Sequence, residues 1–240
     1  MESLGIIGIG RFGKMLGKIF ADDFIVKGYD SNPVSKDIGI EMTDLESVLN
    51  ERTIILAVPI RDFKDLVMNI SPQLKKPCTV IDVCSVKVFP VNVMKDNLPK
   101  SIDIIGTHPL FGPDSYRRSE HLKIMMCDVQ EKKDSFLFWS SYFVSKGFQV
   151  MEMSPEEHDK LAARTQGITH FIGRSLMNAG VNPTSIDTLG FSELYKVIEQ
   201  TCNDSWELFK DLQNYNPYTQ TMIDELENSI AEISKQITGR

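Results

Sequence analysis

Short apolar runs alternate with amphipathic segments along the first part of the chain. Runs of this length that end at Gly, Pro or Asp are typical of buried strands. Between the first two runs, Met15, Leu16, Ile19 and Phe20 recur at helical spacing and fall on one face. The pattern predicts strands at 4–9, 24–29, 53–58, 79–83, 102–106, 123–127 and 148–151, and helices after residue 13, at 61–70 and at 134–146. Strands that alternate with helices, without hairpin signals, indicate an α/β fold with a doubly wound parallel sheet.

From Ser154 onward the pattern is helical only. Ser154-Pro155-Glu156-Glu157 combines an N-cap serine, a proline at the first helical position and a capping glutamate, and predicts one long helix as far as Met177. Further helices are expected at 191–200 and 205–214. In a final helix, five apolar residues form a stripe on one face: Met222, Leu226, Ile230, Ile233 and Ile237. We therefore predict a Rossmann-type domain at residues 1–152 and an all-helical domain at residues 153–240.

Composition narrows the class of protein. The 240 residues carry a net charge of -7, which argues against nucleic acid or an anionic membrane as a partner. No apolar run is long enough to span a bilayer, and the first residues lack the basic region of a signal peptide. The four cysteines form no C-x-x-C pair, so neither a metal site nor a redox dithiol is indicated. We expect a cytoplasmic protein with reduced thiols.

A glycine motif joins the first predicted strand to the helix that follows it. In Gly8-Ile9-Gly10-Arg11-Phe12-Gly13, the first glycine would make the tight turn and the second would let the backbone approach a pyrophosphate. The third would permit close packing of helix on strand. Free N–H groups at the helix start would then bind the phosphates of a dinucleotide. The alternative is a glycine-rich turn without a ligand.

Asp30 lies at the end of the second predicted strand, 17 residues beyond Gly13. An acid at this point accepts bonds from the ribose hydroxyls of NAD and repels the additional phosphate of NADP. NAD is therefore favoured, although Arg11 could contact a phosphate and NADP stays possible. Asp30 could instead only begin an Asx turn. The candidate cofactor contacts are Gly8, Gly10, Arg11, Phe12, Gly13, Asp30 and Val58.

Two polar segments follow buried strands where an α/β sheet binds its ligand: 82–87 and 107–109. His108 lies directly after a strand and before Pro109. The reference pKa of a histidine side chain is about 6.5, which suits a general base that removes an alcohol proton near neutral pH. Ser85 could orient that histidine or bind the same alcohol. Lys87 is interpreted as an ordinary solvated lysine. Together with the glycine motif, these residues favour a hydride-transfer enzyme over a nucleotide-sensing regulator.

These motifs make the chain resemble the TyrA family, the prephenate and arogenate dehydrogenases of tyrosine biosynthesis. The resemblance rests on G-I-I-G-I-G-R-F-G-K (5–14), I-D-V-C-S-V-K-V-F-P (81–90), G-T-H-P-L-F-G-P-D-S (106–115), the S-P-E-E-H-D…T-H segment (151–174) and T-C-N-D-S-W-E-L-F (201–209). It is strongest to the compact plant-type arogenate dehydrogenases, so we expect no fused mutase or regulatory domain. A β-hydroxyacid dehydrogenase would need a lysine in the helix where this chain has Gln166 to His170.

The resemblance implies a substrate, a reaction and site residues. The substrate would be a cyclohexadienol with a ring carboxylate, which loses hydride to NAD and then carbon dioxide. His108 and Ser85 match the family's catalytic pair, and Gln166 and His170 match positions that line the substrate pocket. A core histidine without a ligand is the alternative for His170. The resemblance also implies a homodimer formed through the helical domain, although the apolar helix faces could instead pack internally.

Asp204 bears on the choice of substrate. In the plant-type enzymes an acid here accompanies arogenate, whose side chain carries an ammonium, and a neutral residue accompanies prephenate. Arogenate is therefore favoured, prephenate is the alternative, and a helix cap is the structural explanation for the same aspartate. Many bacterial relatives hold a substrate carboxylate with an arginine where this chain has Lys196, so the cation could be Arg174, Lys196 or Arg164.

Overall fold

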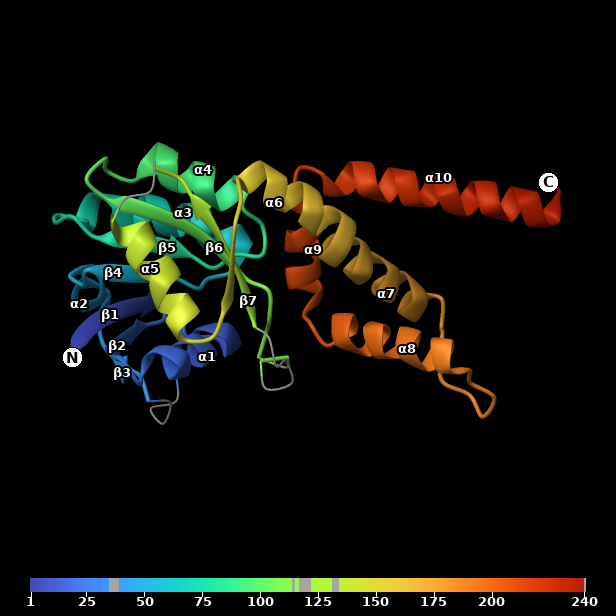
Figure 1. The fold of residues 1–240 in the computed structure, drawn as a ribbon, viewed down its shortest axis with the longest axis horizontal. Helices are drawn as coiled ribbons and strands as arrows, with labels where there is room; N and C mark the ends of the chain where they lie inside the picture. The colour runs from blue at the N-terminus through green and yellow to red at the C-terminus, as the bar shows by residue number, and fades with distance from the viewer. Residues whose placement is uncertain (35–38, 114, 117–121, 131–133, 240) are drawn as a thin grey trace. The chain divides into compact units, whose positions relative to one another are not determined.

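The computed structural model describes residues 1–34, 39–113, 115–116, 122–130 and 134–239 (Figure 1). The chain divides into two compact units, Met1–Glu156 and Glu157–Arg240. The division follows the change from alternating strands and helices to helices alone. The roles that the sequence analysis assigns to residues 1–152 and 153–240 stay predictions.

One eight-stranded sheet forms the centre of the first unit, in the order β3-β2-β1-β4-β5-β6-β7-β8. The strands are β1 (Glu2–Ile7), β2 (Phe24–Tyr29), β3 (Glu41–Met42), β4 (Thr53–Leu56), β5 (Thr79–Asp82), β6 (Asp103–Pro109), β7 (Lys123–Asp128) and β8 (Gln149–Glu152). The chain leaves β1 in one direction toward β2 and β3, then returns to add β4 on the other side of β1. This reversal between β1 and β4 is the switch point at which doubly wound sheets bind ligands. The prediction of a doubly wound parallel sheet is confirmed for every strand pair except that of β6 and β7.

Helices cover both faces of this sheet (Figure 1). They are α1 (Arg11–Phe20), α2 (Leu45–Leu49), α3 (Ile60–Ile70), a 3-10 turn η1 (Ser71–Gln73), α4 (Val88–Asn97) and α5 (Asp134–Ser145). The predicted face of α1 is buried, and it joins α5 and one sheet face in a hydrophobic core cluster. Ile105 belongs to that cluster, whereas its neighbour Gly106 faces Val91 of α4 on the opposite side. The sequence analysis missed α2, α4 and the short β3.

The sheet differs from the prediction at β7. This strand runs antiparallel to β6, with Thr107 opposite Met126 and His108 opposite Met125, while β8 runs parallel to β7. The added pairing extends β6 as far as Pro109. The expectation that His108 follows a strand is therefore wrong, because His108 lies within β6 and is buried.

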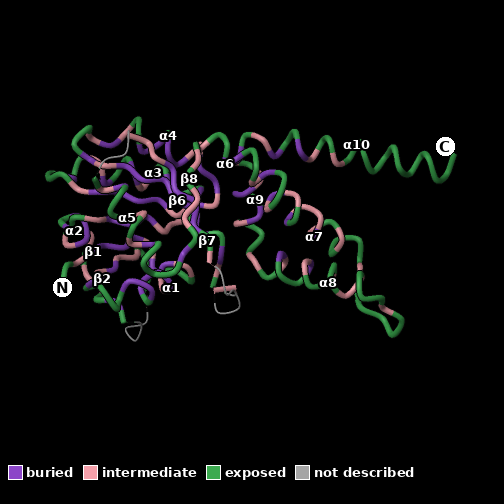
Figure 2. Tube along the Cα trace, in the orientation of Figure 1, coloured by how far each residue is buried: buried purple, intermediate pink, exposed green. Residues whose placement is uncertain are grey.

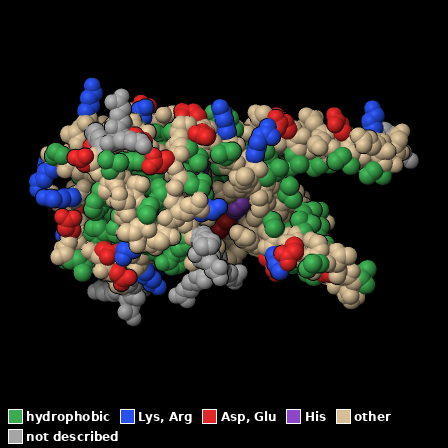
Figure 3. All heavy atoms as spheres, in the orientation of Figure 1, with side chains coloured by type: hydrophobic (Ala, Val, Ile, Leu, Met, Phe, Trp, Pro, Cys, Tyr) green, Lys and Arg blue, Asp and Glu red, His purple; other side chains and the backbone are tan. Residues whose placement is uncertain are grey.

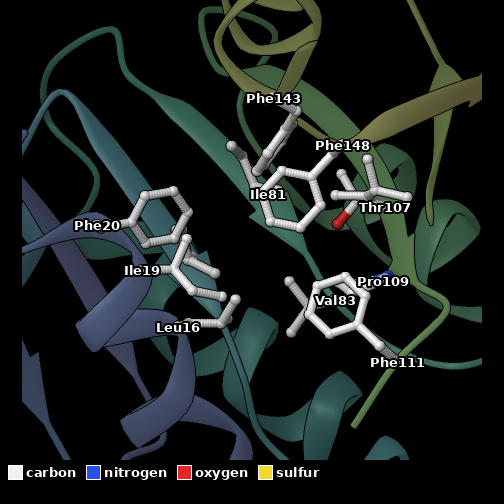
Figure 4. A pocket seen from close by; sticks show the side chains of 12 residues that line it. Leu16, Ile19, Phe20, Ile81, Val83, Thr107, Pro109, Phe111, Phe143 and Phe148 are labelled. Carbon is white, nitrogen blue, oxygen red and sulfur yellow. The ribbon is translucent and has the colours of Figure 1, made fainter. Parts of the chain in front are cut away.

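An apolar cavity of about 10 Å³ lies inside the first unit between α1, α5 and the sheet (Figure 4). Its lining includes Leu16, Phe20 and Val83, with Phe143 and Phe148 from the other side. This space is at the lower limit of what one water molecule needs, about 10 to 15 Å³, and apolar cavities stay dry. We interpret it as a packing gap in the core and place the functional site elsewhere.

Helices alone build the second unit: α6 (Pro155–Ala162), η2 (Ala163–Gly167), α7 (Ile168–Asn178), α8 (Leu189–Cys202), α9 (Trp206–Asn214) and α10 (Thr219–Thr238). The helix predicted from Ser154 to Met177 is present without a gap from Pro155 to Asn178, but it is not α-helical throughout, because η2 is a π-helical segment with wider hydrogen bonding. The Gln213 side chain of α9 donates to the carbonyl oxygen of Gly167 (3.0 Å) and satisfies one backbone group at this irregularity.

The last helix buries only its beginning. Met222 is 3% exposed, whereas Ile230, Ile233 and Ile237 further along the predicted stripe are 57%, 54% and 79% exposed. Figure 2 shows the exposed C-terminal half of α10, and Figure 3 shows a row of hydrophobic side chains along it. Within this unit the apolar stripe thus has internal partners only near its start.

Two further findings concern the described residues as a whole. None of their helices combines the length and apolar character needed to cross a bilayer, and none of their His, Cys, Asp and Glu side chains gather in threes that could hold a metal ion. Cys78, Cys84, Cys127 and Cys202 do not form disulfides, and burial raises the pKa of Cys78 to about 11.

Candidate functional site

The glycine motif forms the turn between β1 and α1 at the switch point of the sheet. Gly8 has φ +97°, and a Cβ there would lie 2.4 Å from the carbonyl oxygen of Ala57, while a Cβ at Gly13 would lie 2.0 Å from the carbonyl oxygen of Gly8. A Cβ at Gly10, by contrast, would meet nothing within 4 Å. The first and third glycines are therefore needed for packing, and the second borders open space. Val58 lies against the turn, 3.1 Å from the Cβ position of Gly8.

The start of α1 is suited to bind an anion. Its N-cap is Gly10, which offers no side chain to the first N–H groups, and no acidic residue occupies the first turn. Arg11 begins the helix with its side chain exposed, and Phe12 is half-buried. Unsatisfied N–H groups and the positive end of the helix dipole favour a phosphate at this point.

Asp30 connects the end of β2 to this turn. One carboxylate oxygen accepts a hydrogen bond from the backbone N–H of Ile9 (2.7 Å), and the other accepts one from the N–H of Asn32 (2.8 Å). The second bond is the Asx turn that the sequence analysis offered as an alternative. Asp30 therefore forms that turn and also fixes the glycine turn, so its negative charge is held beside the motif.

Ser85 and His108 are carried by adjacent strands. Asp82 at the end of β5 pairs with Gly106 of β6, so Ser85 lies three residues beyond the paired position and His108 two residues beyond it. Ser85 is half-buried in the turn that leads into α4, and His108 is 4% exposed. The topology thus brings the two predicted catalytic residues to the carboxyl-terminal parts of two neighbouring strands.

The expectation that Lys87 is solvated is wrong. Lys87 and Asp82 form an ion pair in which both side chains are 0% exposed, and the Lys87 ammonium also donates to the carbonyl oxygen of Thr107. Burial raises the pKa of Asp82, while the ammonium of Lys87 and the N–H of Cys84 act in the opposite direction. Spacing alone could not reveal this burial, because α4, which begins directly after Lys87, was not predicted.

A polar cluster occupies the second unit, where α7 meets the start of α9. The Arg174 guanidinium donates to the backbone carbonyl oxygens of Asp204 and Ser205 and stacks on two rings, 5.3 Å from the centre of Trp206 and 5.5 Å from that of Phe209. The Nε atom of Arg174 and the Nδ1 atom of His170 are both buried without a hydrogen-bond partner. Buried polar atoms without partners are costly, so a cluster that holds two of them is a candidate ligand site.

Asp204 belongs to the same cluster. Burial lowers the pKa of His170, the Asp204 carboxylate raises it and the Arg174 guanidinium lowers it, so both charges lie within electrostatic reach of the imidazole. Asp204 does not cap α9. The cap is Ser205, whose hydroxyl accepts the N–H of Leu208 (3.1 Å). The helix-cap explanation for Asp204 is therefore wrong.

The other candidate residues lie outside this cluster or in irregular structure. Lys196 is exposed and pairs with Glu193 (2.8 Å), and Arg164 is exposed and pairs with Glu225 (2.6 Å). Gln166 is half-buried within η2. Because π-helical spacing differs from α-helical spacing, the separation of four residues does not by itself put Gln166 on the face of His170.

Known proteins resemble this chain over nearly its whole length. The prephenate dehydrogenase nucleotide-binding domain matches residues 20–121, and the TYRAAT1-like C-terminal domain matches residues 175–240. Arogenate dehydrogenase 1, a chloroplastic protein of Arabidopsis thaliana, is 33% identical over 99% of this chain and 39% of its own length. Arogenate dehydrogenase 2 of the same plant is 31% identical over 99% of this chain and 70% of its own length. The chain belongs to the arogenate and prephenate dehydrogenase family.

Solved structures of this family share the fold. A prephenate dehydrogenase from Aquifex aeolicus, in complex with hydroxyphenyl propionate and NAD+, superposes with a TM-score of 0.79 at 21% identity and covers 99% of this chain and 91% of its own. Synechocystis arogenate dehydrogenase superposes with a TM-score of 0.69 at 18% identity, over 99% and 94%. The present chain spans well under half of the first Arabidopsis protein, so its own activity is a matter for proposal.

The residues at the switch point fit the dinucleotide that a member of this family would bind. A pyrophosphate requires the space above Gly10 and the start of α1 without a side-chain cap. A ribose requires a fixed carboxylate such as that of Asp30. The sequence analysis named all of these residues. It missed the part that Asp82, Lys87, Thr107 and Gln213 play, because each of them also makes a contact with a residue at least 20 positions away in the chain.

Proposed function

We propose that the chain catalyses the NAD-dependent oxidative decarboxylation of arogenate to tyrosine. The observation that carries the proposal is the polar cluster in the helical unit, where Arg174 is held against the Asp204 backbone and two aromatic rings and its Nε atom is buried without a partner. The Asp204 carboxylate of the same cluster provides the opposite charge. The side chain of arogenate offers the complementary charges, an ammonium and a carboxylate. Arg174 bonds the Asp204 carbonyl oxygen, so this contact leaves the Asp204 carboxylate available for an ammonium.

Arg174 is the cation that we assign to the side-chain carboxylate of the substrate. It lies in the cluster and has a buried N–H to offer, whereas Lys196 and Arg164 are exposed in surface ion pairs. A planar guanidinium held against two aromatic rings is also better preorganised to bind a carboxylate than a flexible ammonium. Gln166 and His170 would line the same substrate site.

The chemistry assigns one step to each reactive residue. A bound dinucleotide supplies the hydride acceptor. His108 removes the proton of the ring hydroxyl while hydride leaves the carbon that bears this hydroxyl. Ser85 forms a hydrogen bond with the same hydroxyl. Loss of the ring carboxylate as carbon dioxide then produces the aromatic ring of tyrosine. His108 is buried within β6, so the pairing of this strand with β7 fixes the place of its backbone.

The fixed Asp30 carboxylate supports NAD over NADP. Its two backbone hydrogen bonds keep a negative charge at the end of β2, where an additional ribose phosphate would be repelled. Because NADP is a possible alternative, the cofactor has to be tested together with the substrate.

A side-by-side assay tests the proposal. Purified protein is given arogenate or prephenate with NAD or NADP, and reduced cofactor and aromatic product are measured. We expect the highest kcat/KM with arogenate and NAD, with tyrosine as the product. Turnover of prephenate alone would replace the proposed substrate, and turnover of neither compound would refute the proposed activity.

We also propose that the chain is a cytoplasmic homodimer joined through the helical unit. The exposed stripe of Ile230, Ile233 and Ile237 supports a partner helix, since a soluble helix rarely exposes such a row. Four cysteines that form no disulfide fit a reducing compartment. Light scattering should give a dimer for the natural chain and a monomer after Ile233→Lys; a monomeric natural chain would refute the proposal.

A further inference from the structure

The buried pair of Asp82 and Lys87 has no part in the chemistry proposed above. Two charged side chains that are 0% exposed are costly to desolvate, and apolar replacements of such pairs often keep or increase stability. Stability alone is therefore a weak explanation for this pair. The Lys87 ammonium is also fully enclosed, so it cannot be a direct substrate ligand.

The hydrogen bonds of Asp82 and Lys87 indicate a role for the pair. The Asp82 carboxylate accepts the backbone N–H of Cys84 (2.9 Å), directly before Ser85, and binds Lys87, two residues after it. The Lys87 ammonium donates to the carbonyl oxygen of Thr107, directly before His108. The Thr107 hydroxyl in turn donates to the carbonyl oxygen of Asp82 (2.6 Å).

The two catalytic segments thus share one set of buried bonds. The turn that carries Ser85 is fixed on both sides, and the strand that carries His108 is fixed one residue before it. The Cβ position of Gly106, paired with Asp82, lies only 3.4 Å from the Asp82 carboxylate, so the carboxylate is confined against β6.

We propose that Asp82 and Lys87 are positioning residues that set the place of Ser85 relative to His108 for removal of the substrate's hydroxyl proton. The inference rests on the proposed dehydrogenase function. Catalysis depends steeply on such placement, because a displacement of about 1 Å can reduce the rate on the order of 100-fold. A pair that only stabilised the fold would leave the rate unchanged in any variant that still folds.

The choice of variant follows from burial. Lys87→Met alone would strand a buried carboxylate, one oxygen of which already has no hydrogen-bond partner, and the chain could fail to fold. The double variant Asp82→Asn with Lys87→Met removes both charges and keeps the side-chain volumes. The matched control is Lys27→Met with Glu51→Gln, which removes another ion pair of the same unit (2.8 Å) away from the proposed site.

Turnover of the natural chain is measured first, and its absence would refute the proposed function without bearing on the pair. In the double variant we expect a melting temperature within about 4 °C of the natural chain, unchanged NAD affinity and a kcat reduced about 100-fold. The control should keep its kcat. A kcat close to that of the natural chain in the folded double variant would overturn the inference.

A second substitution separates positioning from a structural role. His108→Asn should reduce the kcat of the natural chain strongly but that of the double variant much less, because groups that act as a unit are not additive. A full effect of His108→Asn in both backgrounds would overturn the inference. The imidazole signals of His108 in NMR spectra, assigned with His108→Asn, give a readout without turnover. They should move in the double variant and stay in place in the control, and unmoved signals in the double variant would also overturn the inference.

Discussion

Polar groups are bonded differently in two regions of the molecule. One region is the strand ends of the first unit, and the other is the corner between α7 and α9 in the second unit. At the strand ends, the polar side chains mainly bind the chain itself: Asp30 holds two backbone N–H groups, and Lys87 links Asp82 to Thr107. At the helical corner, His170 Nδ1 and Arg174 Nε are buried with no partner. At the strand ends one oxygen of Asp82 also lacks a hydrogen-bond partner, but it belongs to a carboxylate that is already paired with Lys87, whereas the helical corner has donor and acceptor capacity left for a ligand.

The difference teaches how the two tasks constrain a structure. The proposed transfer of a proton and a hydride requires fixed geometry, which the buried bonds around Ser85 and His108 would provide before a substrate binds. Recognition of a substrate requires that polar atoms be available, and leaving them unpaired costs stability that binding restores. Substitutions in the first region should therefore change kcat, and substitutions in the second should change KM and selectivity.

The largest effect is expected at His108. We expect His108→Asn to reduce kcat by about 100-fold to 10,000-fold, the usual contribution of a general base. NAD affinity, measured by fluorescence titration, should be unchanged because the glycine turn is not altered. A near-normal kcat would remove His108 as the base and break the assignment of chemistry to the strand ends.

Arg174 tests the other side of the comparison. Arg174→Gln removes a charged donor, and the loss of about 1.5 to 3 kcal/mol of charged hydrogen bonding corresponds to an increase in the KM for arogenate of about 10-fold to 150-fold. The kcat should change little. Lys196→Gln and Arg164→Gln, which remove exposed ion pairs, should leave KM within about twofold. A larger effect at Lys196 than at Arg174 would reassign the carboxylate to Lys196.

In the first unit, the sequence predicted the local elements better than the contacts between them. Strand periodicity and the motif from Gly8 to Gly13 depend on neighbouring residues, and the structure has the expected strand, turn and helix there. The reversal of β7, which places His108 inside β6, depends on pairing with residues about 20 positions away. Lys87 was misjudged for a related reason, since only the packing of α4 on β6 determines that it is buried.

The helical corner was predicted residue by residue through family resemblance, but its geometry was not. Spacing of four residues predicted one helical face for Gln166 and His170, and the π segment η2 alters that relation. Sequence also left three cations open for the substrate carboxylate. Only the tertiary contacts of Arg174 with Trp206, Phe209 and the Asp204 carbonyl distinguish it from the exposed alternatives.

Asp204 should control selectivity with a smaller effect than that of Arg174. Asp204→Asn removes the charge for an ammonium, and we expect the ratio of kcat/KM for arogenate over prephenate to fall about tenfold, equivalent to 1.4 kcal/mol. Ser205→Ala is the matched control, because it removes the α9 cap and should lower stability by about 1 kcal/mol while the ratio stays the same. Equal ratios for Asp204→Asn and the natural chain would show that Asp204 does not select the substrate.

The smallest effect concerns stability and pH at His170. Burial lowers the pKa of His170 below the ordinary value, so between the two values the unfolded chain binds one proton more than the folded chain. The free energy of unfolding should therefore fall as the pH decreases below about 6.5, with a slope of at most 1.4 kcal/mol per pH unit from this residue. His170→Asn removes the titration, and denaturant unfolding at a series of pH values should show a flatter curve for the variant. Parallel curves would mean that His170 is not held neutral by burial, and its Nδ1 would then no longer count among the groups kept available for a ligand.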